Sequence, residues 1–165
     1  MDMHVVGMRY WNDRRGDDAA LGIVDQGRLA CEELAGGAVT YSEAEFPEER
    51  RSDDRIANLG TLGDAIATEV AAGARAGKRV VALGSNCTTL PGILGGLQDV
   101  HGPTAKLGLV WFDAHGDFNT PRATLSGMLG GMPVAVSAGL CYPTWRVASH
   151  LAAPIPTDRI LMVDV

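Results

Sequence analysis

The sequence has little cysteine, few aromatic residues and no excess of basic side chains. Its three cysteines, Cys31, Cys87 and Cys141, are odd in number and widely spaced, and none forms a CxxC pair. A disulfide framework is therefore not expected. Lysine and arginine number 14 against 20 aspartates and glutamates, which leaves a formal net charge of −6. Because binding to the phosphates of a nucleic acid needs a basic face, we expect no nucleic-acid partner.

Long hydrophobic runs are also missing. No stretch approaches the ~18 apolar residues that span a bilayer, and residues 1–6 lack the basic region of a signal peptide. We therefore expect no membrane partner and a cytoplasmic protein. What the chain does have is 165 residues of which 46% are hydrophobic, enough to bury one sizeable core. Residues 1–165 are expected to form a single domain.

Short apolar runs alternate with segments of helical periodicity. The clearest helical periodicity lies at residues 54–76. Either Ser52 or Asp53 is expected to cap this helix, and Gly77 lies where it should end. The runs at 79–84 and 107–112 are typical of strands covered on both faces. Expected strands lie near 5–8, 38–41, 79–84, 107–112 and 159–163, and expected helices near 19–34, 54–76 and 88–100. This alternation predicts an α/β fold with a parallel sheet, in which ligands bind beyond the carboxyl ends of the strands.

The loop after the strand at 107–112 carries the most unusual chemistry. Asp113, His115 and Asp117 alternate there with Ala114 and Gly116. In an extended chain, residues i, i+2 and i+4 project to one side, so the three side chains are expected to converge. Two carboxylates and an imidazole suit a divalent ion such as Mn²⁺, Fe²⁺, Co²⁺ or Zn²⁺. The simpler alternative is a solvated acidic turn; the strand-end position favours a metal site.

A second candidate follows the strand at 79–84. Cys87 lies where the next helix begins, and a helix N-terminus favours the thiolate and hence nucleophilicity or metal binding. The alternative is a buried, inert thiol. His4, His101 and His150 have no partner at ligand spacing and are expected to be structural. The glycine-rich segment 124–133 matches no nucleotide-binding loop, and a helix is expected to begin near Pro133.

Together these segments resemble the ureohydrolase (arginase/agmatinase) family of binuclear-manganese amidinohydrolases. Residues 110–121, VWFDAHGDFNTP, are similar to the family's central Asp-Ala-His-x-Asp-x-Asn motif. Residues 126–133, SGMLGGMP, resemble its Ser-Gly-Asn-x-His-Gly-x-Pro segment, and residues 84–88, GSNCT, its Gly-Gly-Asp-His-Ser loop. The resemblance implies a three-layer αβα fold with a mainly parallel sheet, here truncated after about five strands.

The resemblance also implies roles for the matching residues. Asp113 would bridge two metal ions, while His115 and Asp117 would each hold one. These three residues would carry catalysis, with Mn²⁺ as the cofactor, as one or two ions. The substrate would be a small guanidino-type amino acid, whose α-carboxylate and α-amino groups would be bound by Asn119, Thr124 and Ser126. The reaction would be metal-assisted hydrolysis to an amine and urea or a urea analogue.

Three positions depart from the family pattern. Cys87 replaces a histidine ligand, and because Mn²⁺ prefers oxygen and nitrogen, metal binding there should be weaker. Gly130 replaces a histidine that shuttles protons or orients substrate, so a contribution of ~10²-fold is missing. Met128 replaces a polar substrate contact. A cysteine in the first loop with Leu-Gly-Gly-Met after the serine is similar to the subgroup that includes N-hydroxyarginine amidinohydrolase, whose substrate is a weaker base and a better electrophile.

The resemblance covers only the N-terminal half or so of a typical member. In the family's sheet order, strands later in sequence lie between the one ending at Leu83 and the one ending at Phe112. We therefore expect these two strands to be separated, with unpaired edges and exposed apolar faces. Closure of the two strands against each other is the alternative. The separation favours a fragment or truncated gene product, a homo-oligomer, or completion by another chain.

Two main functional hypotheses follow. The first is a manganese-dependent amidinohydrolase that acts on a guanidino or N-hydroxyguanidino amino acid and is weak or inactive as this chain alone. The second is a non-catalytic metal- or ligand-binding remnant, or a subunit completed by a partner. A generic metal-dependent deacetylase or phosphatase would explain residues 113–117, but it leaves residues 119–133 unexplained.

Overall fold

The computed structural model describes residues 1–84 and 86–165, with backbone only for residues 18–21. Three parallel strands form the main sheet in the order β4-β1-β5. Their bounds are Met3–Met8 for β1, Val39–Glu43 for β4 and Arg79–Gly84 for β5. A separate parallel pair consists of β6, Leu109–Phe112, and β7, Ile160–Val163. The predicted α/β class with parallel strands is confirmed.

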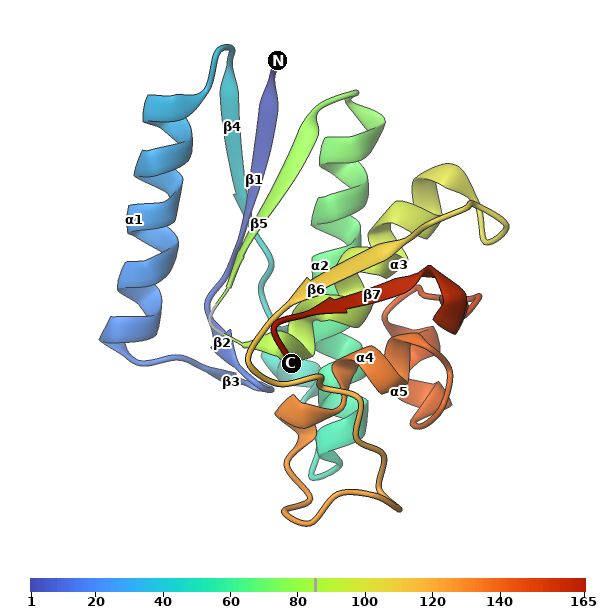
Figure 1. Cartoon of the computed structure of the whole chain (residues 1–165). Helices are drawn as coiled ribbons and strands as arrows, with labels where there is room; N and C mark the ends of the chain where they lie inside the picture. The colour runs from blue at the N-terminus through green and yellow to red at the C-terminus, as the bar shows by residue number, and fades with distance from the viewer. Residues whose placement is uncertain (85) are drawn as a thin grey trace.

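Helices cover both faces of the main sheet (Figure 1). Helix α1, Asp18–Leu34, packs on one face, where Gly27 meets Leu83 of β5. Helices α2, Arg55–Arg75, and α3, Leu90–His101, lie on the other. The core on that side is formed by side chains of β1, of the loop that follows β1, of the segment after β4 and of α2, namely Val6, Met8, Tyr10, Ala44, Phe46, Leu62, Ile66 and Val70. This is the predicted three-layer arrangement.

The start of α2 differs from the expected one by a residue or two. Neither Ser52 nor Asp53 caps the helix: Asp54 does, and its carboxylate accepts hydrogen bonds from the backbone N–H groups of Ile56 and Ala57. All three residues are good N-caps, so sequence alone does not rank them. The end is as predicted, because Gly77 follows the last turn with φ of +69°, a conformation that glycine adopts without strain.

The second sheet is covered on one face only. Leu109, Trp111, Ile160 and Met162 pack towards the buried residues Leu90, Leu94, Val134, Leu151 and Ile155. On the opposite face Phe112 is 75% exposed, and Val110 and Leu161 are more than half exposed. The prediction that residues 107–112 form a strand buried on both faces is therefore wrong. An uninterrupted apolar run gives no sign of which face lacks a covering layer.

In the part of the chain that the structure describes, β5 and β6 do not pair. They belong to different sheets, and their carboxyl ends converge on one region below the centre of the molecule (Figure 1). The expected separation is confirmed, and closure of β5 against β6 is not observed. Residues 1–84 and 86–165 contain five strands of four or more residues, as predicted.

Smaller elements complete the chain. The polar loop after β1 contains an antiparallel hairpin of β2, Tyr10–Trp11, and β3, Arg14–Arg15, which the sequence pattern did not indicate. Helix α4, Pro133–Ser137, begins at the expected proline, while α5, Pro143–Ala148, was not expected. Short 3₁₀ turns lie at Glu48–Arg50, Cys87–Thr89, Leu129–Gly131 and Thr157–Arg159. No helix among the described residues is long and apolar enough to cross a bilayer.

Candidate metal centre

The loop after β5 places Cys87 at the edge of the sheet. Asn86 adopts an extended backbone, and its side-chain oxygen accepts a hydrogen bond from the N–H of Thr88 at 2.9 Å. That cap starts the 3₁₀ turn Cys87–Thr89, which runs directly into α3. The thiol of Cys87 is consequently fixed at the carboxyl end of β5 by the start of a helix, as the sequence predicts.

The loop after β6 is not extended. Residues 113–115 form a bend, and Asp117 has a left-handed backbone with φ of +45°. The carbonyl of Asp117 accepts hydrogen bonds from the N–H groups of Val134 and Ala135 at the start of α4. These bonds fix the unusual conformation of Asp117, which a non-glycine residue adopts only at a cost. The alternation expected from an extended chain is therefore wrong for this segment.

Three ligand atoms from the two loops form one group. The sulfur of Cys87 and one carboxylate oxygen each from Asp113 and Asp117 all lie within 4.8 Å of one another. The thiol of Cys87 donates to Oδ2 of Asp113 at 3.5 Å. Asp117 is buried, and its Oδ2 has no hydrogen-bond partner among the described residues. A buried carboxylate oxygen without a partner is costly, so this group is suited to a bound cation.

The electrostatics of the group are those of negative charges held close together. Burial, together with the neighbouring carboxylates of Asp117 and Asp113, raises the pKa of Cys87 to about 12. Burial and the charge of Asp113 also raise the pKa of Asp117, whereas the backbone N–H of His115 lowers that of Asp113. The raised pKa favours the alternative of a protonated, buried thiol in the metal-free protein. Burial of the thiol is the largest cause of this shift, and the two carboxylates act in the same direction.

A divalent cation fits this donor set. It would compensate the two carboxylates and allow the thiol to ionise, because metal ligands bind in their deprotonated forms. The carboxylates suit Mn²⁺, while the thiolate favours softer ions such as Zn²⁺ or Co²⁺. The residues therefore fit a metal ion. The same group with a histidine in place of Cys87 would fit Mn²⁺ better.

His115 lies outside this group. Its side chain is 82% exposed, with Nδ1 at 3.5 Å from Oδ1 of Asp113. The bend at 113–115 turns the imidazole towards solvent, while its backbone N–H donates to Oδ1 of Asp113 at 3.0 Å. The predicted convergence of Asp113, His115 and Asp117 is therefore met by the two aspartates only. Cys87 takes the third place.

The predicted substrate-binding residues occupy one long loop between β6 and the turn Leu129–Gly131. Asn119 is exposed, and its N–H donates to the carbonyl of Gly131. The hydroxyls of Thr124 and Ser126 accept hydrogen bonds from the N–H groups two or three residues further on. Among the described residues no side-chain hydrogen bond joins these three residues to the metal group. Their role in binding substrate stays a prediction.

Gly130 lies beside the first loop. A Cβ built on Gly130 would meet only the side-chain nitrogen of Asn86, at 3.9 Å. The position is therefore open and faces the segment that carries Cys87. Met128, the other departure from the family pattern, is exposed.

A cavity of about 550 Å³ opens next to Cys87, between β5 and β6. It is lined on one side by Gly84 and Cys87 and on the other by Trp111 and Phe112. The apolar run alone predicted that their strand is covered on both faces, whereas the family's strand order predicted unpaired edges and exposed apolar faces. The family's strand order, which separates the two strands, was the signal that pointed to this opening.

Comparison with known proteins shows which family the sequence and the fold resemble. A model of the arginase family matches residues 3–160. The arginase of Bacillus caldovelox is 29% identical over 132 residues, which are 78% of this chain and 43% of that protein. The arginase of Entamoeba histolytica is 47% identical over 49 residues, 30% of this chain and 17% of that protein. The chain spans less than half the length of these relatives.

Solved structures show the same fold. The crystal structure of Entamoeba histolytica arginase in complex with L-ornithine superposes with a TM-score of 0.79 at 19% identity, over 98% of this chain and 57% of that chain. Bacillus cereus arginase gives 0.77 at 24% identity, over 98% and 55%. At these identities the likeness establishes the fold, while the match to the family model extends over nearly the whole sequence. The chain belongs to the arginase family.

Proposed function

We propose that the protein is a manganese-dependent amidinohydrolase that hydrolyses a guanidino or N-hydroxyguanidino amino acid to an amine and urea or hydroxyurea. The observation that carries the proposal is the buried, unpartnered Oδ2 of Asp117 beside Cys87 and Asp113. Three ionisable side chains held this close in a protein of this family are best explained as ligands of a divalent ion.

Asp113, Asp117 and Cys87 would hold the ion, with His115 at the rim. When bound, a divalent ion would lower the pKa of water from ~15.7 to about 7 and so supply a hydroxide nucleophile for the guanidinium carbon. His115, exposed and next to Asp113, would complete the ligand set or accept a proton. Asn119, Thr124 and Ser126 would position the amino-acid end of the substrate.

An N-hydroxyguanidino substrate is favoured over a guanidine. Gly130 provides no side chain where a histidine would assist proton transfer, and Cys87 weakens binding of Mn²⁺. An N-hydroxyguanidine is a weaker base and needs less assistance at its central carbon. The proposal therefore predicts a higher kcat/KM for N-hydroxyarginine than for arginine.

The test uses the protein as isolated, with any partner chain retained. Bound metal is measured by elemental analysis, and release of urea and hydroxyurea is assayed with both substrates. Retained metal with faster turnover of N-hydroxyarginine supports the proposal. Equal or reversed rates reject the substrate assignment, and failure to retain any divalent metal rejects the metal centre itself. Asp117→Asn, which keeps the size of the side chain, should lose both metal and activity.

A second function is favoured by the exposure of His115 and by the unpaired edges of β5 and β6. In this alternative the chain is a metal- or ligand-binding remnant, or a subunit completed by a partner. Stoichiometric metal without turnover of either substrate would support it. We propose in either case that hydrolysis by this chain alone is weak or absent, because the unpaired edges of β5 and β6 leave the site open on one side.

The remaining proposals concern organisation. Residues 1–165 are proposed to act as one domain, because α2 packs both on the main sheet, through Ile66, and against Trp145 of α5, through Leu59. The exposed apolar face of Phe112 and Leu161 supports assembly with another copy or another chain. A cytoplasmic location is proposed from the acidic composition and the three free cysteines.

A further inference from the structure

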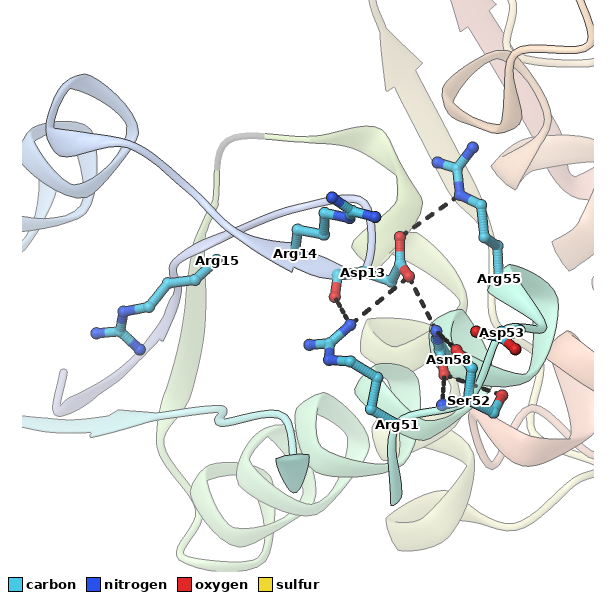
Figure 2. A pocket seen from close by; sticks show the side chains of 8 residues that line it. All are labelled: Asp13, Arg14, Arg15, Arg51, Ser52, Asp53, Arg55 and Asn58. Carbon is cyan, nitrogen blue, oxygen red and sulfur yellow. Dashed lines mark hydrogen bonds and ion pairs between the residues drawn. The ribbon is translucent and has the colours of Figure 1, made fainter. Parts of the chain in front are cut away.

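A pocket rich in arginine lies among the loops that follow β1 and β4 (Figure 2). Four guanidinium groups and two carboxylates line this cavity of about 690 Å³. The lining residues are Asp13, Arg14, Arg15, Arg51, Ser52, Asp53, Arg55 and Asn58. The whole chain carries a net charge of −6, so a local concentration of arginine is unexpected. None of these residues belongs to the metal group or to the predicted substrate loop.

Asp13 organises the pocket from beneath. Its side chain is 6% exposed, and Oδ2 accepts a hydrogen bond from Nδ2 of Asn58 at 3.0 Å. Arg51 and Arg55 approach the same carboxylate at 3.8 and 3.7 Å. Asp13 thus orients two cations from separate elements, the loop after β4 and the first turn of α2. Such support from a buried residue pre-organises the pocket.

The arginines are not equally engaged. Arg51 forms two short ion-pair hydrogen bonds with Glu48 and donates to the carbonyl of Asp13, so its guanidinium is occupied. Arg15 pairs with Glu43 and points away from the others in Figure 2. In contrast, within the described part of the chain Arg14 has no ion pair or hydrogen bond from its side chain. Arg55 has only the 3.7 Å approach of its Nε to Asp13.

Arg14 and Arg55 therefore offer unused donors on either side of the Asp13 carboxylate (Figure 2). A guanidinium presents a planar fork that matches the spacing of two oxygens in a carboxylate or phosphate. We propose that this pocket binds the oxyanion group of a small ligand, a carboxylate or a phosphate, between Arg14 and Arg55. Asp53, an exposed carboxylate in the lining, opposes an anion and limits its affinity.

The proposal is independent of the metal centre and of the proposed hydrolysis. It is tested by titrating isotopically labelled, full-length protein with inorganic phosphate and, separately, with malonate, while backbone and arginine side-chain NMR signals are recorded at low ionic strength. We expect saturable shifts confined to residues 13–15 and 51–58. Saturation by one probe alone identifies phosphate or carboxylate as the recognised group, and saturation by both identifies an oxyanion site.

Matched charge variants sharpen the test. Arg14→Gln should weaken the tighter probe by about tenfold, the equivalent of one charge-assisted hydrogen bond, whereas Asp53→Asn should tighten it. Arg79→Gln removes the same charge at the amino end of β5, on the opposite edge of the sheet, and should change nothing. The proposal would be overturned by shifts that fail to saturate, by shifts that spread to Arg79, or by an affinity in Arg14→Gln equal to that of the unchanged protein. Far-ultraviolet circular dichroism of each variant excludes misfolding as the cause.

Discussion

The thiol of Cys87 lies 3.5 Å from Oδ2 of Asp113, although 26 residues separate them in the chain. The contact joins the loop after β5 to the loop after β6, across strands that do not pair with each other. A sulfur placed among carboxylates is unusual for a manganese site, because Mn²⁺ prefers oxygen and nitrogen ligands. The contact therefore has consequences for which metals bind and how they are detected.

The first prediction concerns direct ligation by Cys87. Adding Co²⁺ to the metal-free protein should produce a sulfur-to-cobalt charge-transfer band in the near ultraviolet, because the ion displaces the thiol proton. Cys87→Ser should abolish the band. Cys141→Ser, which removes another half-buried free thiol, should leave it unchanged. A band that persists in Cys87→Ser would show that the sulfur of Cys87 is not a ligand.

The second prediction concerns metal preference. Replacing the sulfur by a nitrogen ligand in Cys87→His should raise affinity for Mn²⁺ relative to Zn²⁺. Changes in the outer shell of a metal site already alter affinity by about 10–100-fold, so a change of ligand should alter the ratio by at least about tenfold. Competition dialysis with both ions measures it. An unchanged ratio would indicate that Cys87 does not contact the ion in either protein.

Much of this fold could be predicted from the sequence. Periodicity located α2 and its end at Gly77, and apolar runs located β1, β5 and β7, because these signals arise from local packing. The burial of β6 was mispredicted because Val110 and Phe112 are apolar whether or not a layer covers them. The hairpin of Tyr10–Trp11 and Arg14–Arg15 was missed because each of its strands is only two residues long, too short for an alternating pattern to show.

The candidate site was predicted in part, for a related reason. The chemical types of Cys87, Asp113 and Asp117 could be read directly, and their meeting follows from the convergence of strand ends. The orientation of His115 could not be read, because it depends on a bend and on the left-handed conformation at Asp117. That conformation depends in turn on hydrogen bonds from residues 134 and 135, which are distant in sequence.

The third prediction concerns pH and His150. This residue joins two helices: Nδ1 lies 2.5 Å from Asp99 of α3 and Nε2 lies 2.8 Å from Asp64 of α2, which also pairs with Arg50. Burial lowers the pKa of His150, but the hydrogen bonds to the two carboxylates outweigh it and raise the pKa above its ordinary value of 6.5. The stabilisation is therefore fully present below pH 6.5 and is lost as the pH rises through the higher value of the folded protein.

His150→Asn tests this linkage. Asparagine tolerates the left-handed backbone at this position, where φ is +63°, so the substitution removes the imidazole without adding strain. We expect a loss of about 1 kcal/mol in the free energy of unfolding at pH 6 and a smaller loss at pH 9. His101→Asn, at an exposed histidine, is the control. An equal loss at both pH values would contradict the assignment.

The fourth prediction concerns the close packing of α3. A Cβ on Gly95 would lie 1.8 Å from the carbonyl oxygen of Ser149, a backbone atom that cannot move without shifting the end of α5. Gly95→Ala should therefore lower the free energy of unfolding by about 3 kcal/mol. Gly22→Ala is the matched control: nothing lies within 4 Å of its Cβ, so helix propensity should stabilise α1 by about 0.5–1 kcal/mol. Urea denaturation measures both, and similar midpoints for the two variants would show that α3 has room to move away from Ser149.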